Sequence, residues 1–235
     1  MENVALLQTF LRSTLCCLAP SRRKRSSSHL MSTYCQDQSG FTLLELLVVI
    51  LMVGVLAAIA APGWLGFVQQ RRATAAGDAV VRALQEAQSK AKTQKLSFNA
   101  SFRNRDGLPQ VAIYPTGTDV NTLPDTSWKN LGEQLELKSG QIVLRTNLEA
   151  DNQVGATIDE IDNNEVKTVS FNLLGNLPTN AQLSTIAGNT NPEGIVVEVA
   201  APQGGATVVA NTRRCVKIRT LLGSLQAERK DNCDV

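Results

Sequence analysis

Histidine is almost absent from this 235-residue sequence. The single histidine, His29, precedes a long apolar run, so the rest of the chain has no imidazole for base catalysis or metal ligation. Phosphate-binding glycine loops, Cys-x-x-Cys pairs and nucleophile elbows are also missing. The acidic residues 159–165 lack the spacing of an EF-hand calcium loop, and we interpret them as a solvated loop. We therefore expect no enzymatic activity, no cofactor and no metal site.

A strong charge of either sign is also lacking. The formal net charge of +2 comes from 23 basic and 21 acidic residues. Five of the basic residues lie in residues 1–40, against Glu2 and Asp37, which leaves 18 basic and 19 acidic residues, a net charge of −1, in the remainder. A charge so close to zero excludes a bulk electrostatic attraction to nucleic acid.

Long apolar runs are limited to one, residues 41–68, in which Glu45 is the single charged residue. About 20 apolar residues are enough to span a bilayer. The small residues Ser39 and Gly40 precede the apolar run. In a secretory signal peptide the small-residue cleavage site follows the apolar run, and that run is shorter. The basic residues 22–25 before the run favour a single-pass topology in the cytoplasmic membrane, with the C-terminal domain outside.

Glu45 is the unexpected residue of this run. A carboxylate in a membrane segment is unfavourable by about 2.5–3.5 kcal/mol on insertion scales. Cleavage after Gly40 would leave the amino group of Phe41 one helical turn from Glu45, in the same chain or in a neighbouring copy. Pairing with a neighbour would make the glutamate an assembly residue. The alternative is a plain signal anchor whose glutamate lies among the lipid headgroups.

The sequence GFTLLELLVVILMVGVLAAIAAP resembles the class III signal of type IV pilins and type II secretion pseudopilins. The resemblance implies a prepilin peptidase that cuts after Gly40 and methylates Phe41. It also implies an assembly role for Glu45 and helix-weakening roles for Gly54 and Pro62. The partners it implies are the prepilin peptidase/methyltransferase, other pilin or pseudopilin subunits and an inner-membrane assembly platform.

The prepilin leader implied by this resemblance would be residues 1–40, which is long for the family. A start at Met31 would leave the ten-residue leader MSTYCQDQSG, although this shorter leader contains no Lys or Arg. Both starts remain open.

Beyond the apolar run, small and aliphatic residues recur at steps of three and four, which is typical of one face of a helix. They are Ala73, Ala76, Val80, Leu84, Ala87 and Ala91. We expect one helix from about residue 41 to about residue 95. Its first part, residues 41–68, would lie in lipid, and its amphipathic second part, residues 69–95, would pack on a domain.

Residues 96–235 have the alternation and turn residues of strands. LSFNASF and QVAIYP predict one hairpin, and QLELKSGQIVLR predicts a second that turns at Ser139-Gly140. Further strands are expected in VKTVSFNLLGNL, GIVVEVAAP, ATVVA and RRCVKIRT. A long helix followed only by strands predicts an α+β fold in which the helix packs on an antiparallel β-sheet. This order resembles the GspH/FimT-type minor pilins, and implies a structural subunit of a type IV pilus or a type II secretion pseudopilus.

Cysteine is scarce after the expected leader. Cleavage of the leader would remove Cys16, Cys17 and Cys35. Cys215 and Cys233 remain, and in a domain outside the cytoplasm we expect them to form one disulfide. The alternative is two free thiols.

Basic residues gather near the C-terminus, at Arg213, Arg214, Lys217 and Arg219. Strand alternation predicts that Lys217 and Arg219 point outward, with Val216 and Ile218 inward. Resemblance to FimT-like proteins implies an alternative function, a filament-displayed subunit that binds DNA during uptake through these residues. Aromatic residues for base stacking are missing here, so the contacts would be to the duplex backbone. The other interpretation is a solvated edge that pairs with acidic loops of neighbouring subunits.

Overall fold

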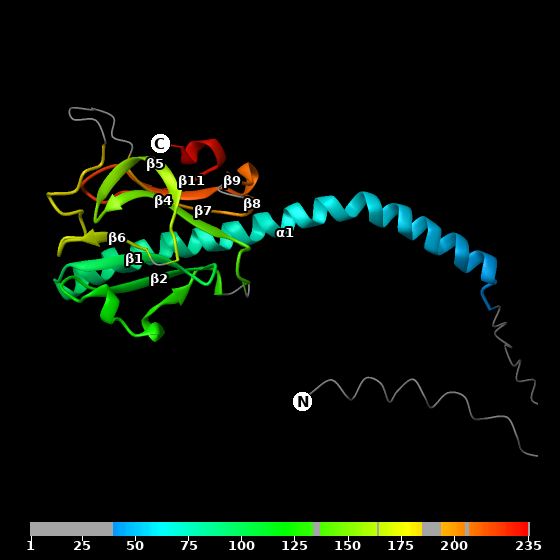
Figure 1. Ribbon diagram of the computed structural model, residues 1–235, viewed down its shortest axis with the longest axis horizontal. Helices are drawn as coiled ribbons and strands as arrows, with labels where there is room; N and C mark the ends of the chain where they lie inside the picture. The colour runs from blue at the N-terminus through cyan, green and yellow to red at the C-terminus, as the bar shows by residue number, and fades with distance from the viewer. Residues whose placement is uncertain (1–39, 134–136, 164, 185–193, 205–206, 235) are drawn as a thin grey trace, which may run out of the picture. The chain divides into compact units, whose positions relative to one another are not determined.

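The computed structural model describes residues 40–133, 137–163, 165–184, 194–204 and 207–234, which include every element labelled in Figure 1. Residues 1–39 of the expected leader, which include the alternative start at Met31 and the first three cysteines, lie outside the described residues. The described chain divides into two units, one that ends at Val48 and one that begins at Val49.

The first element is one long helix, α1 (Leu43–Gln94), which begins and ends within two residues of the limits expected from the sequence. Thr42 caps its start, because its Oγ1 accepts a hydrogen bond from the backbone N–H of Glu45 at 3.2 Å. The helix ends where Lys95 takes the left-handed conformation, with φ of 56°. The helix continues through both Gly54 and Pro62, so their helix-weakening role stays a prediction.

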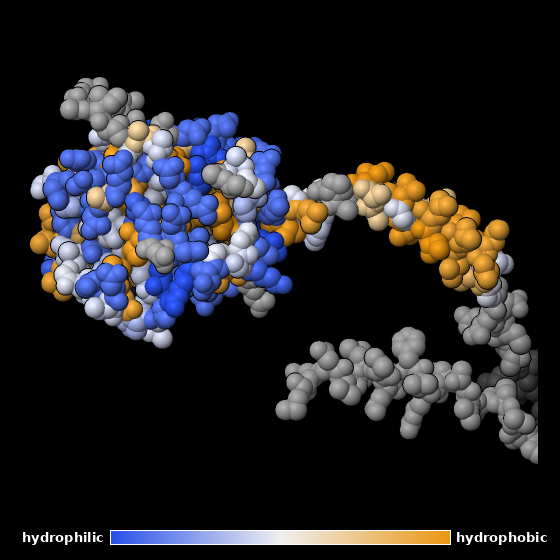
Figure 2. Space-filling view, in the orientation of Figure 1, coloured by the Kyte–Doolittle hydropathy of each residue, from blue (hydrophilic) through white to orange (hydrophobic). Residues whose placement is uncertain are grey.

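The helix changes character along its length. Its segment Leu43–Ala60 is long and apolar enough to cross a membrane, and none of it is buried. Figure 2 shows this exposed apolar surface in orange, whereas the visible face of the domain is mostly hydrophilic. The second half carries the predicted stripe, and all six of its members are at most 1% exposed: Ala73, Ala76, Val80, Leu84, Ala87 and Ala91. The stripe prediction is confirmed.

The strands form two main antiparallel sheets and a small third one. The first sheet has the order β3-β2-β1-β6, the second β11-β10-β7-β4-β5, and the third pairs β8 with β9. The strands are β1 (Phe98–Arg105), β2 (Leu108–Pro115), β3 (Lys129–Asn130), β4 (Val143–Ala150), β5 (Gln153–Glu160), β6 (Val166–Phe171), β7 (Ile195–Ala200), β8 (Pro202–Gly204), β9 (Thr207–Val208), β10 (Arg214–Ile218) and β11 (Leu225–Arg229). The predicted α+β class is therefore confirmed.

One core joins the second half of α1 to both sheets, along which it runs in Figure 1. Phe102 of β1 and Phe171 of β6 have no exposed surface, and Leu144 of β4 and Val199 of β7 are equally buried. The helix stripe is made mostly of alanine, which lets the backbones of strands approach closely. Gly77 shows how close, because a Cβ atom there would lie 2.8 Å from Cβ of Arg214 in β10.

The predicted hairpin at Ser139-Gly140 is wrong. The described residues 137–142 contain no strand, and β4 pairs instead with β5, through a turn at Asp151 and Asn152, and with β7. The sequence is ambiguous here, because the turn at Gly140 before β4 and the turn at Asp151 and Asn152 after it are both suitable for a hairpin. Which of them joins two paired strands depends on the strand that the core places beside β4.

Two Leu-Leu-Gly turns, residues 173–175 and 221–223, meet beside α1 although they are far apart in the sequence. Gln88 holds them together, because its Nε2 donates to the carbonyl oxygens of Gly175 at 3.1 Å and Gly223 at 2.6 Å. Both glycines have positive φ, 76° and 73°, which favours glycine at these positions.

Candidate functional site

The N-terminal candidate site is the short segment that leads into α1. Gly40 and Phe41 are exposed and precede the first helical residue, with Phe41 80% exposed. A Cβ atom on Gly40 would meet nothing within 4 Å. The described residues therefore give no packing reason for glycine at this position, and they leave the Gly40–Phe41 bond sterically open.

Glu45 occupies the third position of the helix, and Thr42 and Glu45 have the spacing of a capping box. A carboxylate in the first turn also interacts favourably with the helix dipole. In the described residues its side chain is exposed and has no hydrogen bond or ion pair. The free amino group that could pair with it does not exist in the uncut chain, because Phe41 is still joined to Gly40.

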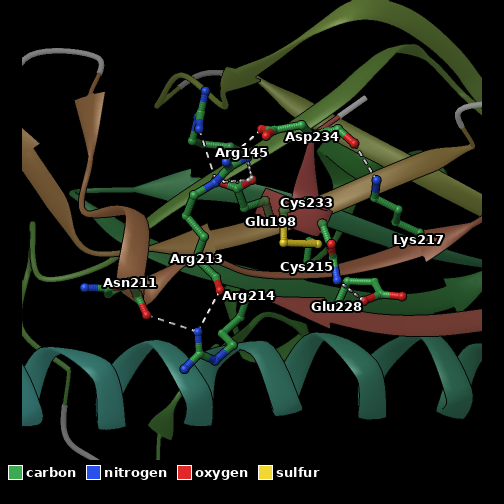
Figure 3. The surroundings of a disulfide bond; sticks show 11 residues. Arg145, Glu198, Asn211, Arg213, Arg214, Cys215, Lys217, Glu228, Cys233 and Asp234 are labelled. Atoms are coloured by element: carbon green, nitrogen blue, oxygen red, sulfur yellow. Dashed lines mark hydrogen bonds and ion pairs between the residues drawn. A yellow bond between two sulfur atoms is a disulfide. The ribbon is translucent and has the colours of Figure 1, made fainter. Parts of the chain in front are cut away.

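The C-terminal candidate site is built around a residue that the sequence reasoning missed, Glu198 of β7. Its side chain has no exposed surface, and Figure 3 shows two guanidinium groups converging on it. Arg145 of β4 lies 3.1 Å from its Oε1, and Arg213 lies 2.8 Å from its Oε2. A single acidic residue within the apolar run IVVEVA was the available signal, because a carboxylate in a buried strand requires cationic partners.

The guanidinium of Arg213 forms ion pairs with two carboxylates of its own chain. Besides Glu198 it contacts Asp234 at 2.7 Å, and its side chain is only 13% exposed. The hydrogen bonds to Glu198, and after them the contact with Asp234, raise the pKa of Arg213 above its usual value. Arg213 is thus a structural cation that neutralises a buried charge, and the expectation that it lies on a solvated edge is wrong.

Arg214 packs between β10 and the helix. It is 8% exposed, and its guanidinium donates to Thr74 Oγ1 of α1 at 3.2 Å and to the carbonyl oxygens of Asn211 and Arg213 at 3.3 and 2.7 Å. Burial lowers the pKa of Arg214, and the nearby charge of Arg229 lowers it further. This arginine too is turned inward.

Lys217 lies on the face opposite Val216 and Ile218, as expected, but the expectation that it is exposed there is wrong. It is 3% exposed, and its Nζ donates to the carbonyl oxygen of Asp234 at 2.5 Å. Burial lowers the pKa of Lys217, and the neighbouring charge of Arg219 adds to the effect. Of the four basic residues selected from the sequence, only Arg219 is exposed.

The side chains of β10 alternate as expected, but Lys217 is not exposed because β10 lies inside its sheet and both of its faces are covered. β7 and β11 flank it. Val216 and Ile218 join the main core, whereas Cys215 packs on the opposite face with Ile158, Val196 and Cys233. The covering element on that face is the C-terminal 3-10 turn, Lys230–Cys233.

A disulfide between Cys215 and Cys233 attaches this turn to the sheet (Figure 3). Cys215 is 3% exposed and Cys233 is fully buried. Asp234, the residue after Cys233, contacts both Arg213 and Lys217, so the disulfide and the polar contacts hold the same turn on the sheet.

Comparison with known families gives one match: the prokaryotic N-terminal methylation motif, at residues 35–61. No characterised protein and no solved structure matches the chain. The motif covers the Gly40–Phe41 bond, Glu45 and most of the apolar half of α1. The chain therefore carries a prepilin signal of the type IV pilin kind, followed by a helix long and apolar enough to cross a membrane. Such a signal implies processing by a peptidase and assembly with other pilins, the role of a structural subunit.

Proposed function

We propose that this protein is a minor subunit of a type IV pilus or a type II secretion pseudopilus. It is inserted in the inner membrane by the apolar half of α1, cut between Gly40 and Phe41, methylated on Phe41 and assembled through Glu45. The C-terminal domain then lies outside the cytoplasmic membrane and becomes part of the filament. Its partners are the prepilin peptidase, other pilin subunits and the assembly platform.

The observation that carries this proposal is the methylation motif on an exposed, capped helix start. No described residue packs against Gly40, which is consistent with a glycine kept for recognition by the peptidase. Glu45 lacks an ionic partner among the described residues, and cleavage would create an amine one helical turn away. Both features match a precursor that becomes competent for assembly only after it is cut.

Membrane fractions that contain the peptidase test the proposal. Mass spectrometry of the processed protein should find N-methylated Phe41 as its first residue. Gly40→Ala should leave the precursor uncut, whereas Gly54→Ala, a second glycine with nothing within 4 Å of its Cβ position, should be processed normally. A mature chain that still contains the intact Gly40–Phe41 bond would contradict the proposal.

The alternative of a DNA-binding subunit has weaker support. Three of the four cations that the sequence assigned to DNA are occupied by partners within the chain: Arg213, Arg214 and Lys217. Releasing them to bind phosphate would leave Glu198 without one of its two partners and expose the sheet face under the C-terminal turn.

A further inference from the structure

A short stretch of α1 lies between the apolar segment Leu43–Ala60 and the first buried residue of the stripe, Ala73. Three of its side chains, Trp64, Phe67 and Arg71, follow one another at steps of three and four, which places them on one helix face. The ring centroids of Trp64 and Phe67 are 5.9 Å apart, and the Arg71 guanidinium lies 4.9 Å from the Phe67 centroid.

These aromatic rings face outward. Trp64 is 66% exposed and Phe67 46% exposed, whereas the chain's other tryptophan, Trp128, is only 7% exposed. The same exposed surface continues toward the apolar segment through the small residues Ala57, Ala60 and Gly63. A large apolar surface that the domain does not cover calls for an external partner.

The order of side chains along this face matches the layers at the edge of a bilayer. With Trp64 at the hydrocarbon boundary, Arg71 lies seven residues, about 10 Å, further along the helix at about 1.5 Å per residue, and its guanidinium turns back over the Phe67 ring. Each polar interface of a bilayer is about 5–8 Å thick. Tryptophan favours the boundary of the hydrocarbon, and arginine reaches from there to the anionic phosphates.

We propose that Trp64, Phe67 and Arg71 form an interfacial anchor that binds phospholipid headgroups at the end of the span next to the β domain. The two rings occupy the hydrocarbon boundary and Arg71 pairs with phosphate. The anchor fixes the depth of the helix, and with it the height of the domain above the membrane, before assembly. It rests on the membrane insertion in the proposed function and adds its lipid contact.

The adjoining apolar span argues for lipid over a neighbouring helix as the occupant. The aromatic pair is continuous with Leu43–Ala60, in which no residue is buried, and Arg71 follows it. A helix–helix contact in the membrane would favour small residues throughout, because close backbone approach drives such contacts. Here the small residues Ala57 and Ala60 give way to two bulky rings as the span ends.

The depth of Trp64 can be measured in the full chain with Trp128→Phe, which leaves Trp64 as the single tryptophan. This substitution suits the site, because the buried Nε1 of Trp128 has no hydrogen-bond partner among the described residues. The chain is reconstituted in phosphatidylcholine and phosphatidylglycerol vesicles that carry bromines at different acyl depths. Trp64 fluorescence should be quenched most by bromines nearest the headgroups. A chain with Trp64→Phe, which retains the buried Trp128, is the control and should show little quenching.

Three results would overturn the anchor. The first is maximal quenching by the deepest bromines, which would place Trp64 within the hydrocarbon. The second is no quenching while the chain floats with the vesicles, which indicates a protein partner over the rings. Failure to float at all is the third, and it contradicts the proposed membrane insertion as well.

Arg71 is tested separately in the same single-tryptophan chain. Arg71→Gln should raise quenching of Trp64 by aqueous acrylamide about twofold in vesicles with phosphatidylglycerol, because the phosphate contact of the anchor is lost. Arg82→Gln removes an exposed arginine three turns further along the helix and should leave quenching unchanged. Equal quenching in both variants would overturn the role of Arg71.

Discussion

Arg213 Nη2 lies 2.8 Å from Oε2 of Glu198, a carboxylate with no exposed surface. The pair joins β7 to the residue that precedes β10, and Asp234 extends it to the C-terminal turn attached by the disulfide. Removing one member of a buried ionic network leaves a charge without its partner, which is more destabilising than losing an exposed pair. The main role of the basic C-terminal segment is therefore to stabilise the fold.

Arg213→Ala should lower the free energy of unfolding by about 3 kcal/mol, because Glu198 keeps only Arg145 as a partner. Denaturant unfolding of the oxidised protein in mild detergent measures this difference. Arg219→Ala, at an exposed residue, should change the stability by less than about 0.5 kcal/mol. Equal losses in the two variants would contradict the structural role of Arg213.

DNA titrations separate the exposed cation from the buried one. Duplex DNA is added to the mature protein in detergent at about 50 mM and about 200 mM salt, a range over which phosphate contacts weaken steeply. Any binding should decrease in Arg219→Ala and remain in Lys217→Ala, because Lys217 is 3% exposed. Loss of binding in Lys217→Ala, in a variant of unchanged stability, would restore the DNA-binding interpretation.

The cysteine pair makes a prediction about redox state. Non-reducing peptide mapping should recover Cys215 and Cys233 in one linked peptide, and reduction should lower the free energy of unfolding by about 3 kcal/mol for a loop of this length. Reduction should also increase amide exchange in the turn Lys230–Cys233, which the bond attaches to the sheet. Two alkylatable thiols in the native protein would refute the bridge.

Glu45→Gln keeps the shape of the side chain and removes its charge. Membrane insertion and cleavage after Gly40 should be unaffected, since neither requires the carboxylate, whereas incorporation into filaments should fall at least tenfold, corresponding to about 1.4 kcal/mol in a lost ionic contact between subunits. Quantitative blotting of sheared filaments against the membrane pool measures the ratio. Unchanged incorporation would favour the plain signal anchor.

Two glycines of the same helix should respond oppositely to alanine. Gly77→Ala places a Cβ atom 2.8 Å from Cβ of Arg214, so overpacking should destabilise the domain by about 1–3 kcal/mol. Gly54→Ala meets nothing within 4 Å in this chain and should leave the melting temperature of the domain unchanged. A neutral Gly77→Ala variant would show that β10 can move away from the helix.

The sequence alone determined the features that depend on local order. The prepilin signal is a linear motif, and the helix stripe from Ala73 to Ala91 follows from residue spacing. The hairpin of β1 and β2 likewise needs only alternation and a tight turn, here at Asp106 and Gly107. Each of these is set by residues that are close in the chain.

Only the tertiary structure decided where the charged residues of the domain lie. Alternation places Lys217 on the opposite side of β10 from Val216, but it cannot show that the chain's own C-terminal turn covers that side. Glu198 likewise becomes intelligible only when Arg145 and Arg213 meet it from other segments. Burial and charge pairing depend on residues that are distant in the sequence and come together only on folding. A cation that the sequence pattern predicts to be solvated can therefore be a buried ionic partner in the fold.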